Sequence, residues 1–163
     1  MNAFKTLAAA TIVIAAAMPA GARVRSQATI TIDAPIEKVW ALVVDIDRWP
    51  RWNKAVQTAH LAGPVARGAV FNWKSGGMGI RSTFQDIAPM ERLSWTGQTI
   101  GTSAVHAWTF KTTDKGVVVT TTESFDGWLP AILPGTMQKT LDDTLPALLA
   151  SLKVAAEKDV GPR

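Results

Sequence analysis

The feature that most constrains the fold is a change of hydrophobic period late in the chain. Between residues 55 and 127, apolar and polar residues alternate in short segments that end at turn residues, which is typical of antiparallel strands joined by hairpins. Between residues 135 and 157, apolar residues recur at helical spacing instead and form a stripe of Met137, Leu141, Leu145, Leu148 and Leu152. An antiparallel sheet must cover one face with apolar surface, and this helix is the only large apolar element available for it. We therefore predict a sheet that curls around one long C-terminal helix and leaves an interior space between them.

Seven segments are predicted as strands, which makes the fold class α+β. Period-two alternation and flanking turn residues place them at residues 26–33, 55–63, 68–76, 79–89, 91–101, 102–113 and 116–127. A short helical segment is predicted after the first strand, within APIEKVWALVVD, where Pro35 suits the first helical position. Its apolar residues fall on one face, at Ile36, Val39, Trp40 and Val43.

The segment DIDRWPRWN, residues 45–53, places Trp49 and Trp52 on either side of Pro50. A residue that precedes proline disfavours helical geometry, so we predict that the first helix does not continue through Trp49. The favoured interpretation is a structural plug, with both indoles turned toward the domain and the charged residues in water. The alternative is a rim around the entrance to a ligand site.

The first 22 residues differ from the rest of the chain. Lys5 precedes an apolar run of about 13 residues, which is shorter than the roughly 20 that a membrane-spanning helix needs, and Ala20-Gly21-Ala22 fits a cleavage site. We expect residues 1–22 to be a signal peptide and residues 23–158 to form one domain, followed by a frayed tail at residues 159–163. The protein would then be exported, periplasmic or secreted after cleavage near Ala22. The alternative is an uncleaved membrane anchor.

Composition argues against several classes of function. The 163 residues include no cysteine and two histidines, so neither thiol chemistry nor a zinc-type ligand cluster is expected, and we predict no metal and no cofactor. The Lys and Arg residues are scattered and form no basic stripe, which argues against nucleic acid as a partner. The net charge of +4 is compatible with weak contact with an anionic membrane surface.

The strand at residues 102–113 carries the most informative polar residue. His106, Trp108 and Phe110 share one face by parity, and two large aromatic residues indicate that this face points inward. The turn TDKG permits two registers with the next strand, which place His106 opposite either Glu123 or Ser124. In the first register His106 and Glu123 would form a unit for proton transfer. In the second, His106 would be a polar anchor for a ligand or a hydrogen-bonded core residue.

Aromatic residues on the strands and apolar residues on the C-terminal helix are the candidates for lining a ligand cavity. Each is also a reasonable core residue, because wall and core differ only in whether a void adjoins them. The predicted ligand-binding residues are Phe71, Trp73, Phe84, Trp95, His106, Trp108, Phe110, Met137, Leu141 and Leu145.

Three stretches resemble the START-like superfamily, which includes Bet v 1, lipid-transfer START domains and polyketide cyclases. They are ITIDAPIEKVWALVVDIDRWPRWN, HAWTF with GVVVTTTESFDG, and TLPALLASLKVAAE, and they lie within residues 28–157. The resemblance implies a helix-grip fold with a hydrophobic ligand cavity. It does not imply a particular ligand or reaction, since this fold carries many functions.

Three functions are compatible with these features. The favoured one is an exported binding protein for a small or medium hydrophobic ligand, lipid-like or aromatic. The second is an enzyme of the cyclase or dehydratase type that uses His106 as acid and base together with Glu123. The third is a protein-interaction module, which an exposed surface shared by Trp49 and Trp128 would favour.

Overall fold

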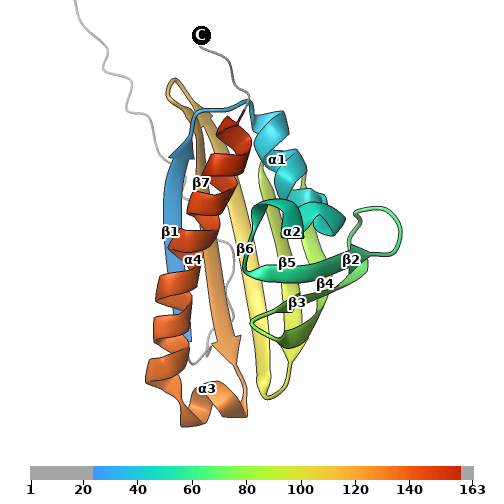
Figure 1. Cartoon of the computed structure of the whole chain (residues 1–163), viewed down its shortest axis with the longest axis vertical. Coiled ribbons are helices and arrows are strands. Elements are labelled where there is room, and N and C mark those ends of the chain that lie inside the picture. The colour runs from blue at the N-terminus through green and yellow to red at the C-terminus, as the bar shows by residue number, and fades with distance from the viewer. Residues whose placement is uncertain (1–23, 159–163) are drawn as a thin grey trace, which may run out of the picture.

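The protein folds into one curved antiparallel sheet that grips a long helix (Figure 1). The structure is a computed structural model that describes residues 24–158, so the predicted signal peptide and tail lie outside the described residues. The seven strands run in the order β1-β7-β6-β5-β4-β3-β2. They are β1 (Val24–Ile32), β2 (Val56–Leu61), β3 (Val70–Ser75), β4 (Met78–Ala88), β5 (Arg92–Thr99), β6 (Thr102–Thr113) and β7 (Gly116–Asp126). The predicted α+β helix-grip architecture with seven strands is confirmed.

The helices cover the concave face of the sheet. They are α1 (Ile36–Val44), the 3₁₀ turn η1 (Ile46–Arg48), α2 (Trp49–Trp52), α3 (Trp128–Ile132) and α4 (Pro134–Glu157). In Figure 1, α4 lies in front of β1 and β7, whereas α1 and α2 lie in front of the middle strands. The short α3 was not predicted, because five residues are too few for a helical period to show.

The helix α4 buries one face against the sheet. Its buried positions are Leu141, Leu145, Leu149, Leu152 and Ala156. Each fully buried leucine contributes about 1.5–3 kcal/mol relative to an exposed one. The predicted stripe contained Met137 and Leu148, which are half-buried, and it omitted Leu149. No helix within residues 24–158 is long and apolar enough to cross a membrane.

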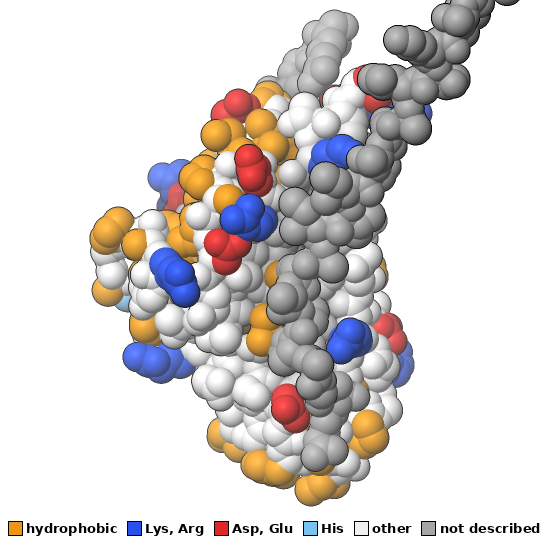
Figure 2. All heavy atoms as spheres, turned by 180° about the vertical axis from the view of Figure 1, so that it is seen from behind, with side chains coloured by type: hydrophobic (Ala, Val, Ile, Leu, Met, Phe, Trp, Pro, Cys, Tyr) orange, Lys and Arg blue, Asp and Glu red, His pale blue; other side chains and the backbone are white. Residues whose placement is uncertain are grey.

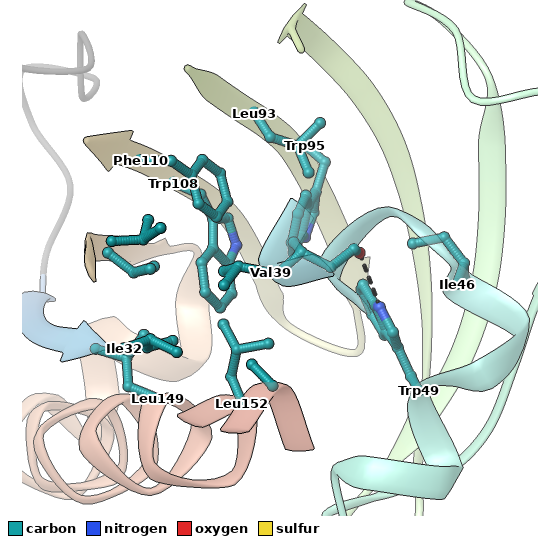
Figure 3. Packing of buried hydrophobic residues seen from close by; sticks show 14 of the residues in the cluster. Ile32, Val39, Ile46, Trp49, Leu93, Trp95, Trp108, Phe110, Leu149 and Leu152 are labelled. Carbon is teal, nitrogen blue, oxygen red and sulfur yellow. Dashed lines mark hydrogen bonds between the residues drawn. The ribbon is translucent and has the colours of Figure 1, made fainter. Parts of the chain in front are cut away.

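Aromatic residues from the sheet form the centre of the core. Figure 3 shows Trp95 and Trp108 from the sheet, Val39 from α1, and Leu149 and Leu152 from α4 around this centre. All five side chains are at most 3% exposed. The core therefore joins the first helix, the last helix and the middle of the sheet.

The first helix ends at Val44, as predicted, but Trp49 has a helical backbone, against the local preference expected from Pro50. Its φ of −50° and ψ of −42° place it at the start of α2, and Pro50 occupies the first turn, where proline is tolerated. The break in α1 falls earlier, because Asp45 has a ψ of 77°. Packing overrides the local preference: Trp49 is 6% exposed and donates from Nε1 to the carbonyl of Val43 at 3.0 Å (Figure 3).

The exposed apolar side chains at one end of the molecule do not include Trp49. Ile100 is 83% exposed, Trp128 59% and Ile132 68%, and these residues lie at the β5–β6 turn and on α3. Figure 2 shows hydrophobic side chains gathered at the lower end, where Figure 1 places α3. Because Trp49 is buried, it shares no exposed surface with Trp128, and the predicted sign of a protein-interaction module is not found.

The turn between β6 and β7 decides the register that the sequence left open. Thr113 pairs with Gly116, and His106 consequently pairs with Glu123, whereas Ser124 pairs with Val105. Two residues form the turn, and Gly116 follows them with a φ of +111°. The structure thus has the register that brings the imidazole and the carboxylate together.

Candidate functional site

A cavity of about 40 Å³ lies between the concave face of the sheet, α2 and α4. Its walls come from β3, β5 and β6, from the end of α1, from α2 and the residues after it, and from α4. The lining residues are Val43, Trp49, Trp52, Asn53, Val56, Trp73, Trp95, His106, Trp108 and Leu148. A cavity needs only about 10–15 Å³ to hold a water molecule, whereas one that binds benzene measures about 150 Å³. An aromatic or lipid-like ligand therefore requires the walls to move apart.

Four of the predicted ligand-binding residues line this cavity: Trp73, Trp95, His106 and Trp108. The others lie elsewhere in the fold. Phe71, Phe84, Phe110, Leu141 and Leu145 are packed in the interior with at most 6% exposure, and Met137 is half-buried near the start of α4. Strand parity shows which face a side chain is on, but not whether a void adjoins it. Phe71 and Phe84, for example, fill the space with each other at a centroid distance of 4.8 Å.

Six lining residues were absent from the predicted set: Val43, Trp49, Trp52, Asn53, Val56 and Leu148. Four of them carried a signal. Leu148 belongs to the predicted apolar stripe of the last helix, Val43 to the apolar face of the first helix, and Trp49 and Trp52 to the WPRW segment that was considered as an entrance rim. Asn53 and Val56 carried none, because their place depends on how the chain leaves α2.

His106 is buried on β6 between two indoles. Its ring centroid lies 4.7 Å from that of Trp95 and 5.3 Å from that of Trp108, and it stacks on Trp108 at an interplanar angle of 6°. Both ring nitrogens contact β7: Nε2 is 2.6 Å from Oγ1 of Thr121, and Nδ1 is 3.5 Å from Oε1 of Glu123. The imidazole therefore meets the cavity with its two nitrogens already directed at protein partners.

The Thr121 hydroxyl joins the imidazole to the backbone of β6. Its oxygen is 2.6 Å from Nε2 of His106 and 3.4 Å from the carbonyl of Ala107, and its one hydrogen can point to either. Donation to Ala107 makes Nε2–H the donor to Oγ1 and leaves Nδ1 without a proton, whereas donation to Nε2 places the ring proton on Nδ1, facing Glu123. The Nδ1–Oε1 distance of 3.5 Å exceeds an ordinary hydrogen bond. A side-chain shift of less than about 1 Å would close it and create a pair able to exchange a proton.

Four of the cavity indoles differ in how their N–H groups are used. Trp49 donates to the carbonyl of Val43, and Trp73 donates to Oγ of Ser82, both at 3.0 Å. The Nε1 atoms of Trp52 and Trp108 are buried and have no hydrogen-bond acceptor among residues 24–158. A buried donor without an acceptor costs about 1–3 kcal/mol, so these two N–H groups are an unusual feature of the cavity wall.

The segment that carries Trp49 and Trp52 is tied to β2 by one carboxylate. Asp47 accepts a hydrogen bond from Nδ1 of His60 at 2.7 Å and one from the backbone N–H of Leu61 at 3.3 Å. The bond from His60 is the main reason why the pKa of Asp47 is lowered from its ordinary value. Residues 24–158 contain no group of three or more His, Asp or Glu side chains that could hold a metal ion.

Residues 23–157 match the model of the family described as polyketide cyclase / dehydrase and lipid transport. The chain belongs to this family. The match covers almost the whole described domain and confirms the START-like resemblance. Comparison with curated protein sequences gives no match.

Solved structures with the same fold have distant sequences. A hypothetical protein, jhp0584 from Helicobacter pylori, is 17% identical with a TM-score of 0.72, and the alignment covers 96% of this chain and 99% of that one. A START superfamily protein from Mycobacterium smegmatis is 16% identical with a TM-score of 0.71, covering 82% and 97%. The di-domain ARO/CYC StfQ from the steffimycin biosynthetic pathway is 18% identical with a TM-score of 0.69, covering 85% of this chain and 52% of StfQ. At these identities the likeness shows the family fold alone.

Proposed function

We propose that this protein binds a small, flat hydrophobic ligand in the cavity between the sheet, α2 and α4. The observation that carries the proposal is the concentration of indoles: five of the seven tryptophans of the chain line one cavity. They are Trp49, Trp52, Trp73, Trp95 and Trp108. An apolar, aromatic wall with few polar groups is typical of sites for small organic ligands.

The ligand enters by displacing part of the wall. The helix α2 is four residues long, and four of the lining side chains are only half-buried: Trp52, Asn53, Trp73 and Leu148. Trp95 and Trp108 on the central strands are each at most 3% exposed. We therefore expect the cavity to open on the α2 side, because the central strands are the more firmly packed wall.

Family membership supports this proposal, since the family description includes lipid transport. We also propose that the protein is exported, which rests on the sequence of residues 1–22. Intact mass measurement of protein from its own host would show a chain that begins near Arg23; a full-length mass would contradict export by cleavage.

Binding is tested by calorimetric titration with two naphthalene probes, acetylnaphthalene and isopropenylnaphthalene. We expect at least one to bind to the unmodified protein with one-to-one stoichiometry. The variant Leu148→Phe adds volume inside the cavity and should weaken binding about tenfold or more. The control Val154→Phe makes the same class of change on α4 at a side chain that is 60% exposed, and it should bind as the unmodified protein does. An equal loss of affinity in Leu148→Phe and Val154→Phe would contradict the proposal. So would a failure of both probes to bind to the unmodified protein.

A second candidate function is acid–base catalysis on such a ligand, and one observation favours it. Nδ1 of His106 faces Oε1 of Glu123 at 3.5 Å inside a largely apolar site, and Glu123 is the more exposed partner, with 15% of its side chain accessible. Glu123 can therefore exchange protons with water, and His106 can exchange them with a bound molecule once Nε2 turns away from Thr121, which it contacts at 2.6 Å. Proton abstraction next to a carbonyl group, the first step of aldol-type cyclisation, is the reaction class that this pair suits.

This catalysis is measurable without knowledge of the natural substrate. The methyl hydrogens of acetylnaphthalene exchange with deuterium in D₂O through the enol, and proton NMR follows the exchange. An active pair would accelerate it over buffer, with a loss of about 10²-fold or more in His106→Gln and a smaller loss in Glu123→Gln. If the probe binds but its exchange rate equals the rate in buffer alone, the protein binds this ligand without catalysing the exchange.

A further inference from the structure

The end of the molecule that carries α3 has an exposed apolar surface. Residues 128–135, WLPAILPG, contain no charged side chain, and six of these eight residues are exposed. Eight large apolar side chains within residues 24–158 are exposed, and half of them gather at this end. These four form what we call the apolar platform: Ile100, Trp128, Ile132 and Leu133. Single exposed apolar residues are ordinary, whereas a group of this kind marks a binding surface.

Trp128 is held at the surface by the turn between β5 and β6. A Cβ at Gly101, where φ is +70°, would lie 2.5 Å from Cε2 of the indole, so the ring rests on the backbone of this glycine. The N–H of Leu129 donates to the carbonyl of Gly101 at 3.0 Å, which ties the start of α3 to the same turn. The exposed indole therefore has a fixed place beside Ile100.

The chain enters the domain beside the platform. Val24, at the start of β1, pairs with Phe125, three residues before Trp128, and Figure 1 shows β1 starting at the end where α3 lies. Residues 1–22, with their apolar run after Lys5, therefore join the domain at this end. A signal peptide or a membrane anchor of this composition enters a lipid bilayer. Both interpretations of residues 1–22 thus bring the platform to a membrane surface.

The composition of the platform suits the interface of a bilayer. Tryptophan is enriched at this interface, because its ring is apolar and its N–H can bond to water or headgroups. Ile100 and Ile132 add aliphatic surface beside it. Since residues 128–135 carry no charge, contact through them requires no anionic lipid.

We propose that the apolar platform docks the domain onto the surface of a lipid bilayer, with α3 and the β5–β6 turn in the interface and the rest of the sheet in water. The indole of Trp128 lies among the headgroups, and the side chains of Ile100 and Ile132 reach the outer part of the acyl chains. Docking is independent of ligand binding, because no platform residue lines the cavity.

The first measurement is flotation of the protein, as its host processes it, with vesicles of neutral phosphatidylcholine. We expect it to float with the vesicles equally at about 0.1 M and about 1 M salt, because apolar contact is not screened. Ile132→Ser should lower the partition coefficient about tenfold, since burial of one such side chain is worth that factor or more. The control Val154→Ser removes an exposed β-branched side chain near the other end of α4 and should leave the partition coefficient unchanged.

The second measurement locates the contact and holds whether or not residues 1–22 are still attached. A phosphatidylcholine with a nitroxide in its headgroup, mixed into lipid nanodiscs, should broaden the indole N–H signal of Trp128 in nitrogen–proton NMR spectra. The signals of Trp95 and Trp108, which are buried in the core, should stay sharp. In Ile132→Ser the broadening at Trp128 should decrease severalfold.

Three results would overturn the proposal. The first is a sharp Trp128 signal with spin-labelled nanodiscs. The second is flotation only with anionic vesicles and its loss at high salt, which would assign the contact to the positive net charge. The third is a dimer that Ile132→Ser dissociates, in protein that does not float, since the platform would then face a second copy. Acetylnaphthalene binding, measured in the same variants, should stay unchanged, which shows that they are folded and keeps this test separate from that of the cavity.

Discussion

Asp47 is a single carboxylate that holds one wall of the cavity in place. It joins η1 to β2 through His60 and the backbone of Leu61, and its pKa is lowered mainly by the His60 hydrogen bond. A carboxylate with a lowered pKa in the folded state stabilises the fold above its unfolded pKa, and the contribution disappears as the pH falls through the folded value. The ordinary pKa of this carboxyl is 3.8, so its contribution to stability is lost at pH values below about 3.8.

Asp47→Asn therefore gives a pH-dependent effect on stability. We expect the unmodified protein to be more stable than the variant at about pH 6, and this advantage should persist to about pH 4 and shrink as the pH falls toward about 3. Urea unfolding at a series of pH values measures it, with Asp114→Asn in the exposed β6–β7 turn as the control. A difference that stays constant over the whole range would show that the His60–Asp47 contact does not stabilise the charged carboxylate.

At the scale of elements, the β6–β7 hairpin is the one on which the site most depends. Its turn sets Glu123 opposite His106, and Gly116 at its end has a φ of +111°. A Cβ at this position would lie 2.3 Å from the carbonyl oxygen of Ile32, at the end of β1. A side chain at position 116 would therefore disturb the β6–β7 turn, its contact with β1 and the pairing of His106 with Glu123.

Gly116→Ala should destabilise the protein by more than about 1 kcal/mol, because both the backbone angle and the space oppose a side chain. Gly135→Ala is the matched control: it lies in the first turn of α4, nothing is within 4 Å of the added Cβ, and alanine there should be neutral or stabilise by up to about 1 kcal/mol. Denaturant unfolding gives both values. Similar free energies of unfolding for the two variants would contradict this account of the turn.

The elements also show how far sequence reasoning reaches. Hydrophobic period alone predicted all seven strands, α1 and α4, because each is long enough for its pattern to repeat. It missed η1, α2 and α3, which are too short for a helical period to show. At Trp49 the hydrogen bond to Val43 and the aromatic neighbours outweigh the preference against helical geometry before Pro50. The register of His106 was open because a turn of two residues and a turn with a bulge both fit TDKG. Only the three-dimensional packing distinguishes the residues that adjoin the cavity from those that fill the core.

At the scale of the whole molecule, the fold forms a partly open, indole-lined cavity of about 40 Å³, smaller than the roughly 150 Å³ of a cavity that binds benzene. The sheet and α4 form a well-packed frame, whereas the short segment from Asp45 to Asn53 completes the wall through Trp49 and Trp52. The proposed binding of an aromatic ligand therefore requires this cavity to enlarge, and we expect movement of that segment to enlarge it. The sheet contributes the fixed part of the aromatic wall, and the short segment contributes the part that we expect to move.

The most direct test of this account is a crystal structure of the protein with bound acetylnaphthalene. The account predicts the naphthalene ring inside the domain, between Trp95 and Trp108 on one side and Leu148 on the other, in an enlarged cavity with Trp52 displaced. Probe bound instead at the exposed end around Ile100 and Trp128, with the walls of the cavity unmoved, would contradict it.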